Sequence, residues 1–323
     1  MNLHRSSQPF SLPLVLLAAF WLMGADKSVE EPANEPKDIT ETLGMDFSET
    51  KIQIIPVRGP VTMLVGRGGN IGVSAGDDGV FLVDDQFAPL TERITTAIRT
   101  LSDQPIQYVL NTHWHYDHTG GNRNLGGQGV ALVAHDNAHA RLVAGQVIEP
   151  FGLSVPPEPA VGLPEITYND TMTFHLNGEA VHVFHVDNAH TDGDSVVHFK
   201  GSNVIHMGDT YFNGMYPFVD VSSDGSIDGM LGAVDQVLAL ANEETKIIPG
   251  HGPLSDRAEL TAYRDMLETV RDRVKSGIKV GKSADQMIEE QILGDLDPKW
   301  GGGAIKAPMF IKITHTDLVR NTE

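Results

Sequence analysis

Short apolar runs separated by turn residues dominate the first part of the chain. Each run is rich in branched apolar residues and bounded by Gly, Asn or Asp, which is the pattern of consecutive β-strands. Residues 88–101 differ, because apolar side chains such as Leu90 and Ile94 recur there at helical spacing and predict one amphipathic helix. The strands that we expect in this part lie at residues 52–57, 61–65, 71–74, 80–83 and 106–110.

The second part of the chain repeats this succession of strands and then turns to helices. Helices are predicted at residues 227–241 and 258–275, and another begins at Ser283, which forms a capping-box pattern with Gln286. Between the two parts, the Pro-rich residues 150–164 are expected to form a long irregular loop bordering a site. The strands expected in this part lie at residues 171–176, 180–186, 195–199, 203–206 and 246–248.

Strands that come in runs, with helices between and after them, favour an α/β fold in which two packed sheets are covered by helices. This is a four-layer αβ/βα sandwich. A single parallel sheet with alternating helices is the competing architecture, and the pattern alone leaves it open.

The amino terminus has the layout of a secretory signal. Arg5 precedes an apolar run at residues 10–23, which ends in the small residues Gly24 and Ala25. The run is too short to span a membrane comfortably. We therefore expect a signal peptide at residues 1–25, a periplasmic or secreted protein, and no stable membrane insertion once the signal is removed.

The rest of the chain divides by composition. Residues 26–45 are rich in Glu, Pro and Asp and are predicted to be a solvated linker. Residues 46–280 contain most of the expected strands and helices and are predicted to form one domain. Residues 281–323 are expected to be a C-terminal extension that packs on this domain.

Charge and cysteine content narrow the function. The chain carries 43 acidic and 23 basic residues, a formal net charge of −20, and such an acidic surface repels the phosphates of nucleic acid. The expected partner is therefore a small-molecule substrate. The chain has no cysteine, which excludes disulfides, thiolate metal ligands and a cysteine nucleophile.

The segment from Asn111 to Asn122 contains the chemistry. His113, His115, Asp117 and His118 fall within six residues, directly after an apolar strand. Imidazole nitrogen and carboxylate oxygen are ligands that suit zinc and related ions. A polar loop with chance histidines is the alternative, but 14 histidines in 323 residues make this density improbable. The segment therefore predicts a metal site.

The spacing His-x-His-x-Asp-His after a strand resembles the signature of the metallo-β-lactamase superfamily. The resemblance implies a later histidine, an acid at a strand end and a histidine in a Gly-flanked turn, and His190, Asp209 and His251 match these positions. It covers roughly residues 50–275 and supports the sandwich fold. It implies one metal ion on His113, His115 and His190, a second on Asp117, His118 and His251, and Asp209 between them.

This resemblance also implies a reaction. Two ions, most readily Zn²⁺ with iron or manganese as the other choices, lower the pKa of a shared water so that hydroxide attacks an acyl bond. The bond is an amide, lactone, ester or thioester, and β-lactamase-like activity falls in this range. Asp117 is expected to orient the hydroxide and move its proton. One of the two aspartates Asp84 and Asp85 is expected to position the metal-binding loop.

Two points remain open. The best-known β-lactamases of the superfamily carry a cysteine where this chain has Asp209, and a lysine for the substrate carboxylate where residues 209–217 have none, so Arg123 is the candidate substrate anchor. The alternative function is an oxidoreductase similar to persulfide dioxygenases, with one iron on His113, His190 and Asp209. The presence of His118 and His251 counts against this alternative.

Overall fold

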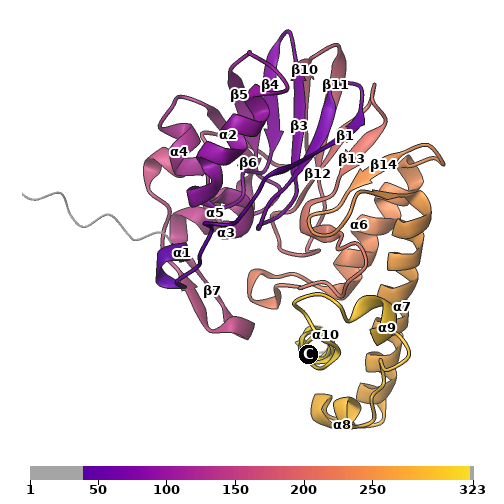
Figure 1. Ribbon diagram of the computed structural model, residues 1–323. Coiled ribbons are helices and arrows are strands. Elements are labelled where there is room, and N and C mark those ends of the chain that lie inside the picture. The colour runs from indigo at the N-terminus through magenta and orange to yellow at the C-terminus, as the bar shows by residue number, and fades with distance from the viewer. Residues whose placement is uncertain (1–38, 321–323) are drawn as a thin grey trace, which may run out of the picture. The chain divides into compact units, whose positions relative to one another are not determined.

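The computed structural model describes residues 39–320, and two facing β-sheets form the centre of the fold (Figure 1). The first sheet is antiparallel from β1 to β4 and parallel from β4 to its last strand. Its strands, in spatial order, are β1 (Gln53–Arg58), β2 (Val61–Val65), β3 (Ile71–Gly76), β4 (Gly79–Val83), β5 (Ile106–Leu110), β6 (Ala131–His135) and β9 (Ile166–Tyr168).

The second sheet is antiparallel except where β13 and β14 run parallel. Its strands, in spatial order, are β10 (Thr171–Leu176), β11 (Glu179–His185), β12 (Ser195–Phe199), β13 (Val204–His206), β14 (Lys246–Ile248) and β15 (Ser255–Asp256). Both sheets therefore contain the strands that the apolar runs predict, with ends that differ by one or two residues.

Side chains alternate between the two faces of each strand, and this alternation separates the apolar layers of the fold. In β4, Phe81 and Val83 belong to the apolar cluster between the two sheets, whereas Val80 and Leu82 belong to the cluster beneath the first layer of helices. Successive side chains of a strand point to opposite faces. A strand that is apolar on both faces is therefore covered on both sides, and β4 is buried throughout.

Helices cover the outer face of each sheet, so the predicted four-layer sandwich is confirmed (Figure 1). The helices of the first sheet's side are α2 (Thr91–Arg99), α3 (Tyr116–Thr119), α4 (Asn122–Gly126) and α5 (Asp136–Ala144). Those of the second sheet's side are α6 (Ile227–Leu240) and α7 (Arg257–Lys279). Short 3-10 turns lie at Ala88–Leu90, Glu149–Phe151, Ala160–Gly162, Gly208–Thr210 and Val221–Ser223.

The chain after α7 forms α8 (Ala284–Glu289), α9 (Asp297–Trp300) and α10 (Ala307–Arg320). Ser283 and Gln286 make the reciprocal hydrogen bonds of the predicted capping box. Buried residues of α10 share one apolar cluster with α6 and α7, so the described part of the C-terminal extension packs on the domain. No described helix combines the length and the apolar character needed to cross a membrane.

Two expectations need correction. The Pro-rich residues 150–164 are not wholly irregular, because β7 (Gln146–Ile148) and β8 (Leu153–Val155) pair as a hairpin around a 3-10 turn. The linker expected at residues 26–45 contains a short helix, α1 (Ile39–Thr42), and it is not fully solvated, because Ile39 and Thr40 are buried. The signal peptide expected at residues 1–25 lies outside the described residues.

Candidate metal centre

Seven candidate ligands meet at one edge of the two sheets. His113 and His115 follow β5, and Asp117 and His118 lie in α3, the turn of helix that comes next. The other three follow strands of the second sheet, namely β11, β13 and β14. They are His190, Asp209 and His251. Their ligand atoms form two sets, each within 4.8 Å: His113, His115, His190 and Asp209 in one, and Asp117, His118 and His251 in the other.

In the first set, three imidazole nitrogens face one another. The Nδ1 atom of His115 lies 3.1 Å from Nε2 of His113 and 2.8 Å from Nε2 of His190. The Oδ2 atom of Asp209 lies 3.9 Å and 3.6 Å from the same two Nε2 atoms. All four side chains are buried.

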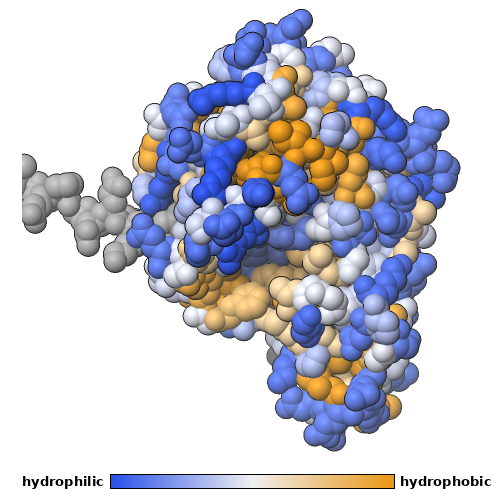
Figure 2. Space-filling view, in the orientation of Figure 1, coloured by the Kyte–Doolittle hydropathy of each residue, from blue (hydrophilic) through white to orange (hydrophobic). Residues whose placement is uncertain are grey.

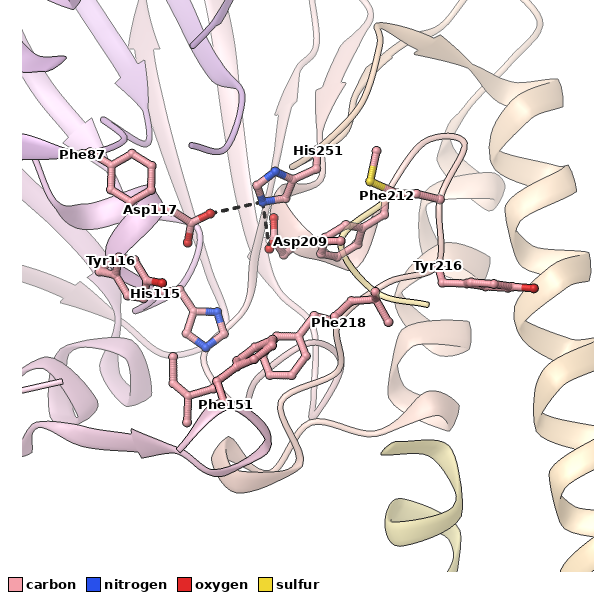
Figure 3. A pocket seen from close by; sticks show the side chains of 14 residues that line it. Phe87, His115, Tyr116, Asp117, Phe151, Asp209, Phe212, Tyr216, Phe218 and His251 are labelled. Carbon is pink, nitrogen blue, oxygen red and sulfur yellow. Dashed lines mark ion pairs between the residues drawn. The ribbon is translucent and has the colours of Figure 1, made fainter. Parts of the chain in front are cut away.

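The second set adjoins the first through Asp209 (Figure 3). The Nε2 atom of His251 lies 3.4 Å from Nε2 of His118, 3.3 Å from Oδ2 of Asp117 and 3.4 Å from Oδ2 of Asp209. The other carboxylate oxygen of Asp209 lies 3.1 Å from Nε2 of His118. Asp209 thus contacts histidines of both sets, which is the position required of a bridging ligand.

The outer nitrogen of four of these histidines is held by another part of the chain. His115 Nε2 bonds to Asp220 Oδ2 at 3.0 Å, His118 Nδ1 to Asp84 Oδ2 at 2.8 Å, and His190 Nδ1 to the carbonyl of Phe218 at 2.8 Å. His113 Nδ1 lies 3.0 Å from Thr112 Oγ1, whose own proton goes to Asp84. An acceptor outside the site places the ring proton on the outer nitrogen. In the neutral form of these rings, the inner nitrogens are therefore the lone pairs that can bind a metal.

Lone pairs that face one another in a buried space fit a pair of divalent ions. Without a cation between them, buried acceptors would lose the hydrogen bonds that water provides. Asp209 Oδ1 shows the same condition: it is buried, it makes no hydrogen bond of acceptable geometry among the described residues, and it lies 3.1 Å from Nε2 of the candidate ligand His118. Five imidazoles and two carboxylates also match the ligand preferences of zinc and similar metals.

The electrostatics suit cation binding. Burial lowers the pKa of His190 to about 4, so this imidazole is neutral at physiological pH. Burial opposes ionisation of Asp117, but the imidazoles of His118 and His251 outweigh it and lower the pKa of this carboxyl to about 2. Burial also opposes the charging of His251, yet Asp209 and Asp117 raise its pKa to about 9. Burial likewise opposes the charging of His118, but Asp209, Asp117 and Asp84 outweigh it and hold the pKa of this imidazole well above its ordinary value. His118 and His251 are therefore the ligands that must release a proton when a metal binds.

Asp84 fixes the start of the metal-binding segment. Its carboxylate accepts hydrogen bonds from the backbone N–H of Thr112 at 2.7 Å, from the Thr112 hydroxyl at 2.8 Å and from His118. The neighbouring Asp85 accepts a hydrogen bond from the backbone N–H of Gly121 at 2.9 Å. Asp84 thus holds the beginning of the segment between β5 and α4, and Asp85 holds its end.

Close packing behind the ligands requires glycine at two positions. A Cβ atom on Gly250 would collide with Oδ1 of Asp209, and one on Gly69 would collide with the ring of His118. Both collisions are with rigidly held groups, so a larger residue would displace a candidate ligand.

Two supporting aspartates escaped the interpretation of the sequence. Asp220 holds His115, and Asp194 accepts hydrogen bonds from the backbone N–H groups of His190 and Thr191 and from the Thr191 hydroxyl. Asp194 follows His190 by four residues, and this short spacing could have indicated that the two residues lie in one turn. Asp220 is 105 residues from His115, and no spacing pattern connects them.

Arg123 is not brought to the metal centre. Its guanidinium forms a two-point ion pair with Glu158, with nitrogen–oxygen distances of 2.6 Å and 3.1 Å. The two residues line a small separate cavity. Of the residues flanking the ligands in sequence, Trp114 is buried and donates to Ser223, and Tyr116 lines the cavity over the metal centre.

That cavity opens directly over the candidate ligands and has a volume of about 280 Å³. His115, Asp117, Asp209 and His251 form its floor (Figure 3). In the space-filling view, a hollow lies between the β7–β8 side of the molecule and the C-terminal helices, and apolar residues border it (Figure 2). A small molecule entering here would meet the metal-binding side chains.

Known proteins resemble this chain in sequence and in fold. A sequence model described as the metallo-beta-lactamase superfamily matches residues 64–252, more than half of the chain. A hydroxyacylglutathione hydrolase of Pelagibacter ubique is 26% identical over 200 residues, covering 60% of this chain and 70% of that protein. The enzyme of the same name from Polaromonas sp. is 26% identical over 185 residues, covering 55% and 60%. The solved metallo-beta-lactamase of Pontibacter korlensis superposes with a TM-score of 0.56 at 19% identity, covering 68% of this chain and 99% of that one.

Proposed function

This chain belongs to the metallo-beta-lactamase superfamily, and from that membership we propose that it is a zinc-dependent hydrolase of acyl bonds, with thioesters as the preferred class. The observation that carries the proposal is the pair of adjoining ligand sets joined by Asp209. The thioester preference is supported by the two hydroxyacylglutathione hydrolases that the chain resembles.

Within this proposal, His113, His115 and His190 would hold one zinc ion, and Asp117, His118 and His251 would hold the other. Asp209 lies next to histidines of both sets. Bound zinc would activate water and polarise the carbonyl of the substrate. The chain itself keeps the four outer ring nitrogens engaged, so the ligands are oriented before any ion arrives.

Asp117 is the proposed catalytic residue. Its carboxylate lines the cavity and is 24% exposed, whereas the other acid of the centre, Asp209, is 5% exposed. With a pKa of about 2, it is ionised at neutral pH and can accept a hydrogen bond from water at Oδ2. In this proposal Asp117 orients the water molecule and passes its proton to the leaving group.

The test joins metal analysis to a substrate panel. We expect two equivalents of zinc per chain and hydrolysis of a glutathione thioester that chelation abolishes and added zinc restores. The panel also contains a chromogenic cephalosporin, an acyl-homoserine lactone and a phosphodiester. Hydrolysis confined to the phosphodiester would contradict the acyl preference.

The alternative of a mononuclear iron oxidoreductase predicts a different outcome. It would give one iron per chain and oxygen uptake with a persulfide substrate, and the His251→Ala variant would retain activity. The contacts of His118 and His251 with Asp209 favour the dinuclear hydrolase, for which we expect that variant to lose most of its activity.

A further inference from the structure

We infer that the cavity over the metal centre selects substrates whose acyl group is hydrophobic and uncharged. The inference rests on the proposed acyl hydrolysis and adds the class of acyl group to it. The acyl carbon must contact the floor of the cavity to react, so its substituent lies against the walls nearest the metal ligands.

Aromatic and aliphatic side chains form the walls, and two of them are tyrosines. Fourteen residues line the cavity, of which four are candidate ligands. The other ten are aromatic or aliphatic: Phe87, Tyr116, Ile148, Phe151, Phe212, Met215, Tyr216, Phe218, Ala304 and Ile305. A carboxylate on the acyl group would lose its hydration against these walls and gain no ion pair in return.

Nearby arginines do not supply such a pair. Arg123 is bonded to Glu158, and Arg141 is bonded to Asp192 and Asp224. Both arginines line the separate cavity on the other side of Tyr116. Among the described residues, the charged side chains that line the cavity over the metals are therefore the candidate ligands themselves.

Aromatic rings flank the ligands on two sides (Figure 3). The ring of Phe212 stacks on His251 with centroids 5.2 Å apart and an angle of 17°. On the other side, Phe218 lies 5.9 Å from the ring of His115, and Phe151 lies 5.0 Å from Phe218. An aryl or alkyl substituent would gain dispersion and aromatic contacts here.

The C-terminal extension completes the cavity. Ala304 and Ile305 line it, and Ile305 is only 5% exposed. The backbone N–H of Tyr216 donates to the carbonyl of Trp300 at 2.9 Å, which fastens this segment to the loop that follows Asp209. The segment lies beyond the residues that the superfamily model matches. Membership of the superfamily therefore does not by itself predict this wall.

The volume limits the size of the acyl group. A cavity of about 150 Å³ holds one benzene molecule, and this cavity of about 280 Å³ is nearly twice as large. It suits a phenylacetyl or medium-length alkanoyl group. Phe151, at the rim of the cavity, is 52% exposed, so this side of the cavity faces solvent.

The experiment compares two thioesters of the same neutral thiol, N-acetylcysteamine: phenylacetyl and 4-carboxyphenylacetyl. For the zinc-loaded enzyme, we expect kcat/KM to be roughly 100-fold higher for the neutral ester, because the buried carboxylate is uncompensated. Equal rates, or a preference for the carboxylate, would overturn the inference and leave acyl hydrolysis intact. If no thioester or other acyl substrate is cleaved, the proposed function itself fails.

Two variants test whether the walls of the cavity produce this preference among acyl groups. Met215→Lys should reduce the preference for the neutral ester at least several-fold by placing a cation on the wall, whereas Leu240→Lys, at an exposed position outside the cavity, should leave it unchanged. Ile305→Ala enlarges the cavity and should improve kcat/KM for 4-phenylbutanoyl relative to phenylacetyl. An unchanged size preference in Ile305→Ala would argue against this wall.

A binding measurement provides a readout that does not depend on turnover. Phenylacetone contains the phenyl group and a ketone that cannot be hydrolysed. Calorimetry should give a lower Kd for phenylacetone than for its 4-carboxy derivative, and Met215→Lys should narrow the difference. Equal Kd values for the two ketones in the parent enzyme would contradict the selection.

Discussion

At the scale of single residues, the metal centre depends on what each imidazole does with its second nitrogen. Asp220, Asp84, Thr112 and the carbonyl of Phe218 hold four outer nitrogens. These contacts fix the orientation of each ring and therefore the direction in which its inner nitrogen points. Affinity for metal should therefore depend on residues that never contact the ion.

Asp220 provides the direct test. Asp220→Asn replaces the carboxylate that accepts the His115 proton with a weaker acceptor, and we expect zinc affinity at the first set to fall about 10- to 100-fold. Competition with a chromogenic chelator measures this loss. Asp285→Asn, a change at a surface carboxylate that is 75% exposed, should leave affinity unchanged, and an equal loss in both variants would contradict the role of Asp220.

His251 should make the metal-free protein sensitive to alkali. Its folded-state pKa is about 9, above the ordinary value of 6.5, because a protonated ring attracts Asp117 and Asp209. This attraction stabilises the fold fully below pH 6.5 and is lost as pH rises through about 9. Denaturant midpoints of the metal-free chain should fall across this window, and His251→Asn should flatten the fall. A ring titration below pH 7 by NMR would refute the expectation.

At the scale of elements, the ligands lie where strands end and loops begin. The loop between β11 and β12 is the clearest case, because Asp194 ties the backbone of His190 and Thr191 into a turn. A side chain that satisfies two buried N–H groups orders the loop before metal binds.

Removing that side chain should therefore destabilise the whole chain. Asp194→Ala leaves two buried N–H groups without this acceptor, each costing about 1–3 kcal/mol. The free energy of unfolding, measured by denaturant titration of the metal-free protein, should fall accordingly. Asp187→Ala, at a neighbouring carboxylate that is 93% exposed, is the matched control. A loss below about 0.5 kcal/mol in Asp194→Ala would be no larger than that of ordinary surface changes.

At the scale of the whole molecule, the fold and the metal centre are separable. Three apolar clusters pack between the sheets and beneath each helix layer. The cluster between the sheets and the cluster beneath α6 and α7 each contain residues from both halves of the chain. The described chain should therefore remain folded without metal, although less stable.

Chelation tests this separation. Zinc at about 1,000 times its Kd stabilises a protein by about 4 kcal/mol for one site. Removing it should lower the Tm and abolish hydrolysis while leaving the far-ultraviolet circular dichroism spectrum unchanged at 25 °C. A random-coil spectrum after chelation would show that the sandwich needs the metal to fold.

Export is the second expectation at this scale. We propose that residues 1–25 direct the chain out of the cytoplasm and are removed. Expression of the full chain in a Gram-negative host, followed by fractionation and N-terminal sequencing, should yield a periplasmic product that begins at Asp26. Retention in the cytoplasm with Met1 intact would contradict this proposal.

Many features of this protein could be predicted from the sequence, because they depend on residues that are neighbours along the chain. Strand limits such as Ile106–Leu110 and the Ser283 cap follow from side-chain periodicity and neighbouring hydrogen bonds. The first four candidate ligands are equally local, since they fall within six consecutive positions after one strand. The choice between a sandwich and a single sheet was not local: the runs of strands favoured the sandwich but left the single sheet open, and the family resemblance supplied the further support.

Only the tertiary structure decided which distant residues meet. The pairing of Asp220 with His115 and the apolar walls contributed by Phe151, Phe218 and Ile305 join segments far apart in sequence. The same packing turned Arg123 toward Glu158 and away from the metal centre. A residue's type and spacing determine what chemistry it can perform, but its partner depends on how the two sheets and the C-terminal helices pack, which no short stretch of sequence encodes.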